Sequence, residues 1–152
     1  MTHKEKAREL FLEGFNCSQA VCAAFCDVTG LSTEQALKIS AGFGAGFGRM
    51  RSICGACSGM AMVAGLLYGY AEASDPDVKG KHYDLIQELS EQFKEENGGS
   101  IICSELLKGI ETNPGTHPDP RTAEYYKKRP CLKIVESAVE ILDEYNEKHL
   151  TK

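Results

Sequence analysis

The sequence is patterned as a series of capped amphipathic helices, and this pattern restricts the possible folds more than any other feature. In most segments apolar residues recur at steps of three and four, which places them on one face of a helix. Cap residues, glycines and prolines separate these segments. Strand-like alternation is nearly absent, and the best candidate strand, residues 100–103, is too short to build a sheet. We therefore predict an all-α fold, a single-domain bundle of about six to eight helices over residues 1–152.

Cap residues also predict where individual helices begin and end. Gly14 is placed to end the first helix, and Asn16 to cap the second, with Gln19 completing a capping box. Gly30 is expected to stop the second helix, and Pro130 to open the last. The expected helices cover residues 3–14, 16–30, 32–41, 56–73, 77–96, 103–109, 122–128 and 130 onwards, with a turn at 74–77 before the fifth.

Residues 52–71 contain no charged side chain, a length close to the ~20 residues that span a bilayer. Glycines and cysteines interrupt this stretch, and its apolar part covers only residues 60–70. We therefore predict a buried central helix near residues 56–73 and no membrane span. Small residues recur at every fourth position on one face, where another helix, in the core or in a homodimer, is expected to approach closely. They are Ala61, Gly65, Gly69 and Ala73.

Four of the seven cysteines stand where predicted helices begin. They are Cys17, Cys54, Cys103 and Cys131. Backbone N–H groups at a helix start are unpaired and carry partial positive charge, which favours the thiolate form of a nearby cysteine. Four such positions, spread along the chain, suggest that helix starts converge on one site. The odd number of cysteines, behind a charged and helical N-terminus, favours a reducing, cytoplasmic location over a secreted disulfide framework.

Cys54 and Cys57 form a C-x-x-C motif at a helix start. In thioredoxin-like proteins this spacing lets one thiol attack a disulfide and the other resolve the intermediate, but there the motif follows a strand, which is missing here. A structural zinc site usually needs a second such pair, which is also missing. Dispersed cysteines from several helices are compatible with a four-thiolate iron–sulfur cluster. Cys22 and Cys26, which share a helix face, are interpreted as small buried residues.

A glycine-rich segment, residues 41–49, precedes the C-x-x-C motif. Its spacing matches neither the G-x-G-x-x-G of dinucleotide-binding folds nor a phosphate-binding P-loop. One interpretation is a tight connection between helices that needs positive φ angles and close backbone approach. In the alternative, Gly46, Gly48 and Arg49 contact a cofactor. Backbone N–H groups would then point to sulfur, and Arg51 would add positive charge.

Charge and histidine placement argue against several functional classes. The chain has 17 basic and 22 acidic residues, a net charge of −5, and no basic face that would indicate nucleic-acid binding. The basic cluster at residues 127–129 is interpreted as a solvated loop end, with the alternative that it places charge near Cys131. The histidines lack the spacing of metalloprotease motifs and are expected at the surface. They are His3, His82, His117 and His149.

The cysteines occur in a recognisable order. Asn-Cys-Ser-Gln-Ala-Val around Cys17 is followed by the glycine-rich segment and by Cys-Gly-Ala-Cys-Ser-Gly from Cys54. A single Cys103 and Pro-Cys131 complete the frame. Over about residues 5–145 it resembles the bacterial and archaeal C-GCAxxG-C-C family of redox-active proteins. The resemblance implies that these four are the family cysteines, and a helical domain with this motif is also similar to the iron–sulfur portion of some multihaem cytochromes. Three cysteines lie outside the family set: Cys22, Cys26 and Cys57.

Three functions fit these observations. The first is electron transfer through an iron–sulfur cluster held by the four family cysteines. The second is metal-free thiol–disulfide chemistry, with Cys54 as nucleophile and Cys57 or a family cysteine as the resolving thiol. The third is a non-enzymatic accessory protein that binds zinc or another metal. The redox functions imply a redox partner protein, and all three require the four thiols to meet in one site.

Overall fold

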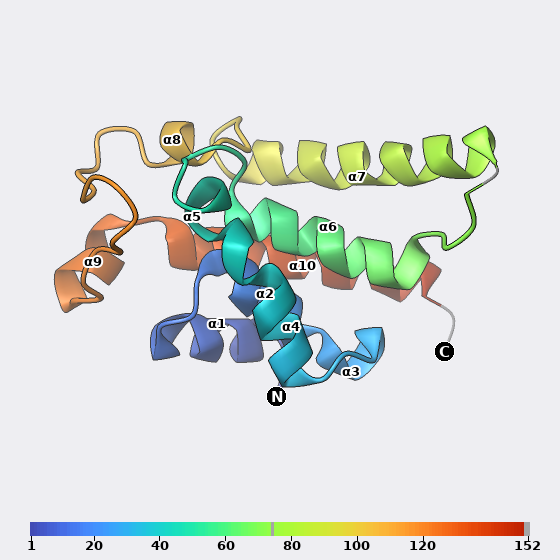
Figure 1. The fold of residues 1–152 in the computed structure, drawn as a ribbon, viewed down its shortest axis with the longest axis horizontal. Coiled ribbons are helices and arrows are strands. Elements are labelled where there is room, and N and C mark those ends of the chain that lie inside the picture. Colours follow the sequence, from blue (N-terminus) through green and yellow to red (C-terminus); the bar gives the residue numbers. More distant parts are fainter. Residues whose placement is uncertain (74, 151–152) are drawn as a thin grey trace.

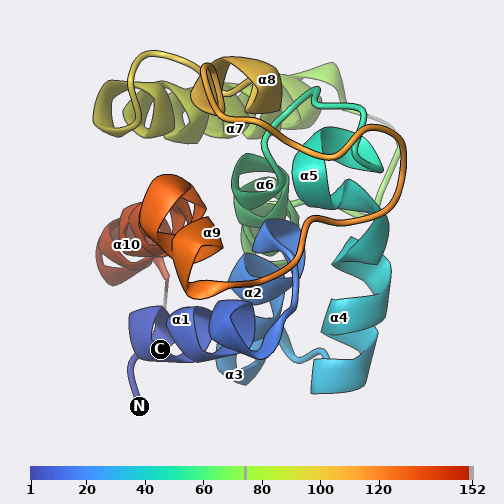
Figure 2. The same ribbon diagram turned by 90° about the vertical axis from the view of Figure 1, so that its left-hand side faces the viewer.

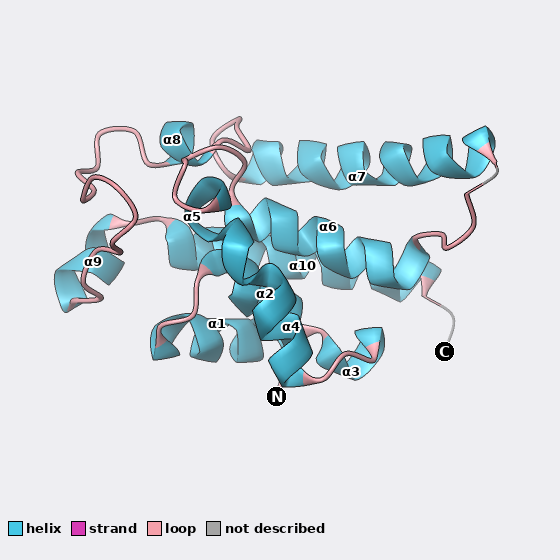
Figure 3. Cartoon of the chain, in the orientation of Figure 1, coloured by secondary structure: helices cyan, strands magenta, loops and turns pink. Residues whose placement is uncertain are grey.

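The computed structural model describes residues 1–73 and 75–150 of the chain, which form helices joined by short connections (Figure 3). This described part contains no strand, so the predicted all-α fold is confirmed. Its helices are α1 (His3–Glu13), α2 (Cys17–Ala24), α3 (Cys26–Thr29), α4 (Thr33–Ser40), α5 (Gly44–Phe47), α6 (Gly55–Tyr68), α7 (Pro76–Glu96), α8 (Cys103–Leu106), α9 (Ala123–Lys128) and α10 (Cys131–His149). A 3₁₀ turn, Ala41–Phe43, joins α4 to α5. Of the turn predicted before α7, Ser74 lies outside the described residues.

The helices pack in layers around α6. Figures 1 and 2 show α7 along one side of the molecule and α1 along the opposite side, with α6, α2 and α10 between them. α6 packs against α2, α7 and α10. Its buried side chains include Met60, Val63 and Ala64, so the predicted buried central helix is confirmed. Across residues 1–73 and 75–150, no helix combines the length and the apolar character needed to cross a membrane.

Helices α6 and α2 approach closely, but not on the face that the small residues predicted. A Cβ atom at Gly59 would lie 2.9 Å from the backbone oxygen of Ser18 and 3.0 Å from Cβ of Val21, which leaves no room for a side chain. At Gly65, in the predicted row of small residues, a Cβ atom would meet nothing within 4 Å. The last two members of that row are exposed, because α6 ends at Tyr68 rather than near residue 73. Regular spacing identified a face of small residues but not which face meets α2.

Capping residues fix the start of α2, as the sequence predicted. Asn16 Oδ1 accepts a hydrogen bond from the Gln19 N–H at 2.9 Å, and Gln19 Oε1 accepts one from the Asn16 N–H at 3.0 Å. Ser32 caps α4 through the same reciprocal arrangement with Gln35. Gly14 ends α1 in the left-handed conformation, with a φ of 113°. Local hydrogen bonding therefore sets the position at which α2 begins.

The second helix is shorter than predicted. It ends at Ala24, and a separate turn, α3, runs to Thr29 before Gly30. Phe25, between the two, has a φ of −104° and a ψ of 17°, outside the helical region. Its ring is fully buried and stacks on His3 with 4.2 Å between the ring centroids. Burial of this ring depends on tertiary contacts, which cannot be predicted from the local sequence pattern.

His3 holds three elements together, so the surface role expected for it is wrong. Its Nδ1 lies 2.6 Å from Asp143 Oδ1, and its Nε2 lies 2.8 Å from Asp27 Oδ1. The ring therefore links the start of α1 to α3 and α10. Burial disfavours the protonated ring, but the hydrogen bonds and charges of the two carboxylates outweigh it and raise the pKa of His3 above 6.5.

Candidate active site

Four helix starts lie at one end of the bundle, and each carries a cysteine. Cys17, Cys103 and Cys131 are the first residues of α2, α8 and α10. Cys54 is the N-cap residue of α6. The prediction that each of these cysteines stands at a helix start is confirmed. Figure 1 shows the starts of α6, α8 and α10 toward the end of the molecule that also carries α5 and α9.

A short backbone bridge places Cys54 beside Cys103. Ile53 and Ile102 form an isolated antiparallel bridge. The N–H of Cys54 donates to the carbonyl of Ile101 at 2.7 Å, and the N–H of Cys103 donates to the carbonyl of Ser52 at 2.6 Å. The apolar run before Cys103, too short to make a sheet, thus serves to join the start of α6 to the start of α8. α8 itself ends at Leu106, earlier than predicted.

Cys17 lies directly against the start of α6. A Cβ atom at Gly55 would overlap the sulfur of Cys17, so the glycine of the Cys-Gly-Ala motif is the residue that lets this sulfur approach. As a hydrogen-bond donor, the neighbouring Cys54 thiol lowers the pKa of Cys17. The backbone N–H groups of Ala45 and Ser18 lower this pKa as well. Neighbours on α2, on α5 and at the start of α6 therefore favour the thiolate form of Cys17.

These contacts give Cys17 and Cys54 opposite acidities. The hydrogen bond from Cys54, reinforced by the backbone donors, lowers the pKa of Cys17 from 9.0 to about 6, although burial opposes the shift. The pKa of Cys54 is raised well above 9.0, because its proton is held by Cys17 and because it is buried. Near neutral pH the pair therefore shares one proton, which resides on Cys54, and the negative charge resides on Cys17.

Cys103 and Cys131 lie close enough to sense that charge. Burial, together with a smaller contribution from the charge of Cys17, raises the pKa of Cys131 to about 12. Burial likewise raises the pKa of Cys103, against a lowering contribution from Arg51, whose Nη1 lies 3.6 Å from the Cys103 sulfur. Both cysteines are therefore neutral thiols near pH 7.

The glycine-rich segment is the tight connection that the sequence predicted. A Cβ atom at Gly46 would lie 2.6 Å from Cα of Arg51 and 2.7 Å from Cβ of Cys103. A Cβ atom at Gly44 would overlap the side chain of Asn16. Non-glycine residues in the segment also adopt the left-handed region, which costs of order 1–3 kcal/mol each. They are Ala45, Phe47, Arg49 and Arg51, with φ between 54° and 74°. The surrounding contacts hold the segment in this strained form around the cysteines.

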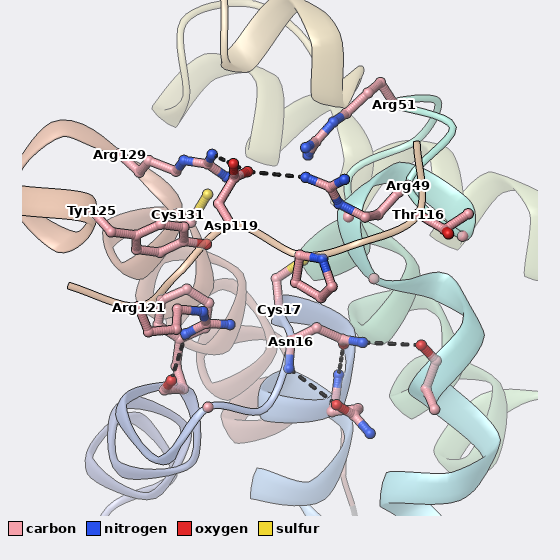
Figure 4. Close-up of a pocket in the computed structure, with 18 residues that line it drawn as sticks. Asn16, Cys17, Arg49, Arg51, Thr116, Asp119, Arg121, Tyr125, Arg129 and Cys131 are labelled. Carbon is pink, nitrogen blue, oxygen red and sulfur yellow. Dashed lines mark hydrogen bonds and ion pairs between the residues drawn. The ribbon is translucent and has the colours of Figure 1, made fainter. Parts of the chain in front are cut away.

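A cavity of about 500 Å³ opens beside Cys17 and Cys131. Figure 4 shows both side chains facing a space surrounded by arginines and Tyr125. Among the described residues that line it, four are arginines and only Asp119 has a carboxylate. The lining arginines are Arg49, Arg51, Arg121 and Arg129. Cys17 is only half-buried and therefore connects the cysteine cluster to the cavity.

Asp119 ties two of these arginines together across the cavity. Its Oδ2 accepts from Arg49 Nη2 at 2.9 Å and from Arg129 Nη2 at 2.6 Å, and its Oδ1 accepts from the N–H of Asn113 at 2.6 Å. The Arg49 and Arg129 side chains are only 10% and 8% exposed. The alternative that the cluster at residues 127–129 places charge near Cys131 is thus realised through Arg129, while the two lysines remain exposed.

Comparison with known proteins agrees with this four-cysteine frame. Residues 15–145 match the model of a family described as "Putative redox-active protein (C_GCAxxG_C_C)". The chain belongs to this family. All four cysteines at helix starts lie inside the matched region. No curated protein and no solved structure gives a significant match to the chain.

The cysteines outside the C_GCAxxG_C_C frame lie away from the cavity. Cys57 Sγ is 3.8 Å from Ser90 Oγ on α7, so the second thiol of the C-x-x-C motif faces a different helix from the first. Cys22 is buried, as predicted, whereas Cys26 is half-buried and packs against the core. Of the seven cysteines, the structure brings together those that the family frame predicts.

The donor chemistry of the site suits an iron–sulfur cluster, but its present arrangement does not. Four thiols are the ligands that such clusters use. Within the described residues, however, no three His, Cys, Asp or Glu side chains are arranged to hold a metal ion. Gly46 is packed against Cys103, while Gly48 and Arg49 line the cavity. The assignment of Gly46, Gly48 and Arg49 to a cofactor-binding site stays a prediction.

Several residues of this C_GCAxxG_C_C site carry no signal in the sequence. Asp119 and Arg121 stand in the proline-rich loop, where nothing periodic marks them. Arg121 donates to the carbonyls of Phe11 at 2.8 Å and Phe15 at 3.0 Å, and its guanidinium lies 4.3 Å from the centre of the Phe11 ring. It therefore fixes the proline-rich loop to the end of α1. In the sequence, only the position of Asp119 close to Arg121 and Arg129 hints that the proline-rich loop returns to the site.

Proposed function

We propose that the protein is a metal-free thiol–disulfide redox protein in which Cys17 is the nucleophile and Cys54 the resolving thiol. The observation that carries this proposal is the contact of Cys17 with the start of α6, where a Cβ atom at Gly55, the residue after Cys54, would overlap the Cys17 sulfur. With a pKa of about 6, Cys17 is about nine-tenths thiolate at pH 7. The assignment differs from the one suggested by the C-x-x-C spacing, which made Cys54 the attacking group and allowed Cys57 to resolve.

The proposed reaction uses one disulfide substrate, written R–S–S–R. The Cys17 thiolate attacks one sulfur, forms Cys17–S–S–R and expels RS⁻. Cys54 then attacks the Cys17 sulfur, forms a Cys17–Cys54 disulfide and expels the second RS⁻, which takes up the proton released by Cys54. The two cysteines are oxidised by two electrons and the substrate is reduced to RS⁻ and RSH. The reverse sequence oxidises two small thiols.

The surroundings of Cys17 suit this role. Cys17 opens onto the cavity, so a substrate sulfur can reach it, whereas Cys54 is buried behind it. Cys103 and Cys131 are held protonated by burial and do not compete as nucleophiles near neutral pH. The backbone N–H groups of Ala45 and Ser18 favour the thiolate form of Cys17, so they also stabilise Cys17 when it is the leaving group.

The proposal is tested by alkylating the reduced protein with iodoacetamide across pH 5–9 and mapping the modified cysteine. We expect Cys17 to react first, with a rate that rises through a pKa of about 6. Cys54→Ala removes the thiol donor, so the pKa of Cys17 should move back toward 9.0. Cys57→Ala, on the same helix but facing Ser90, is the matched control and should leave the profile unchanged. First reaction at Cys54, or an unshifted profile in Cys54→Ala, would overturn the proposal.

An iron–sulfur cluster held by the four family cysteines is the second candidate function. It is favoured by the meeting of four helix starts, whose N–H groups offset the charge of thiolate ligands. It requires the thiols to rearrange from their described positions. Visible absorbance and bound iron in anaerobically prepared protein would support it, and zinc without redox change would support the metal-binding accessory role. A redox partner protein, a cytoplasmic location and a homodimer stay predictions.

A further inference from the structure

The four arginines that line the cavity beside Cys17 are not equally engaged. Arg49 and Arg129 share the carboxylate of Asp119. Arg121 donates to two backbone carbonyls and lies against the Phe11 ring. Each of these three guanidinium groups therefore has at least one oxygen acceptor in the protein. Through these contacts the three side chains hold the proline-rich loop over the site.

Arg51 is the exception. Its Nη1 has the Cys103 sulfur at 3.6 Å as a weak, neutral acceptor. Its Nη2 is buried and has no hydrogen-bond partner, and within the described residues Arg51 takes part in no ion pair. The Arg51 side chain is half-buried, and a guanidinium group partly removed from water without a carboxylate partner loses solvation that no ion pair replaces. The site therefore holds a positive charge that is not matched by the protein around it.

The backbone holds Arg51 in place. Its φ is 60°, in the left-handed region. Its N–H donates to the carbonyl of Ala45 at 3.3 Å, and its carbonyl accepts from the N–H of Ser104 at 3.2 Å. The close contact of Gly46 with the Cα of Arg51 fixes the same stretch from the other side. The fold thus keeps Arg51 at the wall of the cavity (Figure 4), with its Nη1 3.6 Å from the Cys103 sulfur.

We propose that the cavity binds the anionic group of a small disulfide substrate, and that Arg51 receives its carboxylate or similar oxyanion while Cys17 attacks the sulfur. This inference rests on the thiol–disulfide function proposed above. A cavity of about 500 Å³ is of the size that holds small molecules. Even with Cys17 as thiolate and Asp119 ionised, positive charge exceeds negative charge along its wall. A guanidinium binds a carboxylate through two parallel hydrogen bonds, which suits the unpartnered Nη2.

The test compares two disulfide probes with the reduced protein: dithiobis(nitrobenzoate), which carries carboxylates, and dithiodipyridine, which is neutral. The rate of modification at Cys17, identified by peptide mapping, is measured for each probe. Arg51→Gln should lower the rate with the anionic probe about tenfold or more, because a charged hydrogen bond is lost. The rate with the neutral probe should change by less than about twofold. Arg51→Lys should retain part of the preference, since it keeps the charge but not the paired donors.

Arg8→Gln is the matched control. Arg8 lies on α1, its side chain is 52% exposed, and it pairs with Glu136 rather than facing the cavity. It should leave both rates unchanged. Equal loss of both rates in Arg51→Gln, or no loss of either, would overturn the inference while leaving Cys17 as the nucleophile. Failure of Cys17 to react with either probe in the unmodified protein would instead contradict the proposed function itself.

Discussion

The reactivity of Cys17 depends on which atoms touch its sulfur. Cys54 supplies the proton that stabilises the thiolate, and Ala45 and Ser18 supply backbone N–H groups. Gly55 supplies nothing but space, since any side chain there would overlap the Cys17 sulfur. Three of these four neighbours act through the backbone or through absence of a side chain.

Gly55→Ala should therefore displace Cys17. We expect overpacking to lower the free energy of unfolding by about 1–3 kcal/mol and the pKa of Cys17 to rise, because the sulfur leaves its donors. Gly65→Ala on the same helix is the control. A Cβ there meets nothing within 4 Å, so helix propensity should raise the stability by about 0.5–1 kcal/mol. Urea unfolding and the pH profile of alkylation measure both effects. Equal behaviour of the two variants would show that the Gly55 contact is unimportant.

At the scale of the elements, the site depends on where helices start. α2 begins at Cys17 because Asn16 caps it, and the Asn16 amide also donates to the Ala41 carbonyl at 3.0 Å. This second hydrogen bond ties the start of α2 to the turn that leads into the strained segment. A single side chain therefore positions both Cys17 and the loop that surrounds it.

Asn16→Ala should cost about 1–2 kcal/mol of stability and raise the pKa of Cys17, because the first turn of α2 loses its cap. Ser32→Ala removes a cap of the same type from α4, away from the cavity. It should cost about 1 kcal/mol and leave the pKa of Cys17 unchanged. Thermal unfolding and cysteine alkylation separate the two outcomes. A shift of the Cys17 profile in both variants would mean that general loosening, not the cap, controls the thiol.

The helix boundaries and contacts also show which features could be predicted from the sequence alone. Cap residues such as Asn16 and Gly14 act within a few positions, so the start of α2 and the end of α1 could be predicted from local pattern. The break at Phe25 could not, because it accompanies burial of the ring against distant residues. The sequence placed Cys17 and Cys54 in one site but did not single them out as a pair, since their contact depends on the crossing of α2 and α6 at Gly59. Spacing pointed instead to Cys57, which the helix turns toward Ser90.

The arginine-lined cavity was even less visible in the sequence. Arg49 and Arg51 were recognised as charges near the glycine-rich segment, but their different partners depend on Asp119 and on the path of the proline-rich loop. Loops carry no periodic signal that reports where they return to the fold. The left-handed conformation of Ala45 is a further tertiary effect, because local preference alone would assign such an angle to glycine.

At the scale of the whole molecule, His3 joins α1, α3 and α10 at a distance from the four family cysteines. The folded state raises the pKa of His3, so its stabilising contribution is complete below the ordinary pKa of 6.5 and is lost as pH rises through the folded value. Unfolding free energies of the protein and of His3→Gln should therefore differ by about 1 kcal/mol at pH 5.5 and converge at alkaline pH. A difference that grows with pH would contradict the assignment of the two carboxylates as partners.

In the function proposed above, four helix starts, far apart along the chain, converge so that Cys17 and Cys54 form one redox pair. Oxidising the reduced protein with one equivalent of a small disulfide, and mapping the resulting bridge by mass spectrometry, tests this pairing. We expect a Cys17–Cys54 disulfide, the loss of two free thiols and an unchanged Cys57. A Cys54–Cys57 bridge, or a stable adduct at Cys17 that Cys54 does not resolve, would contradict it.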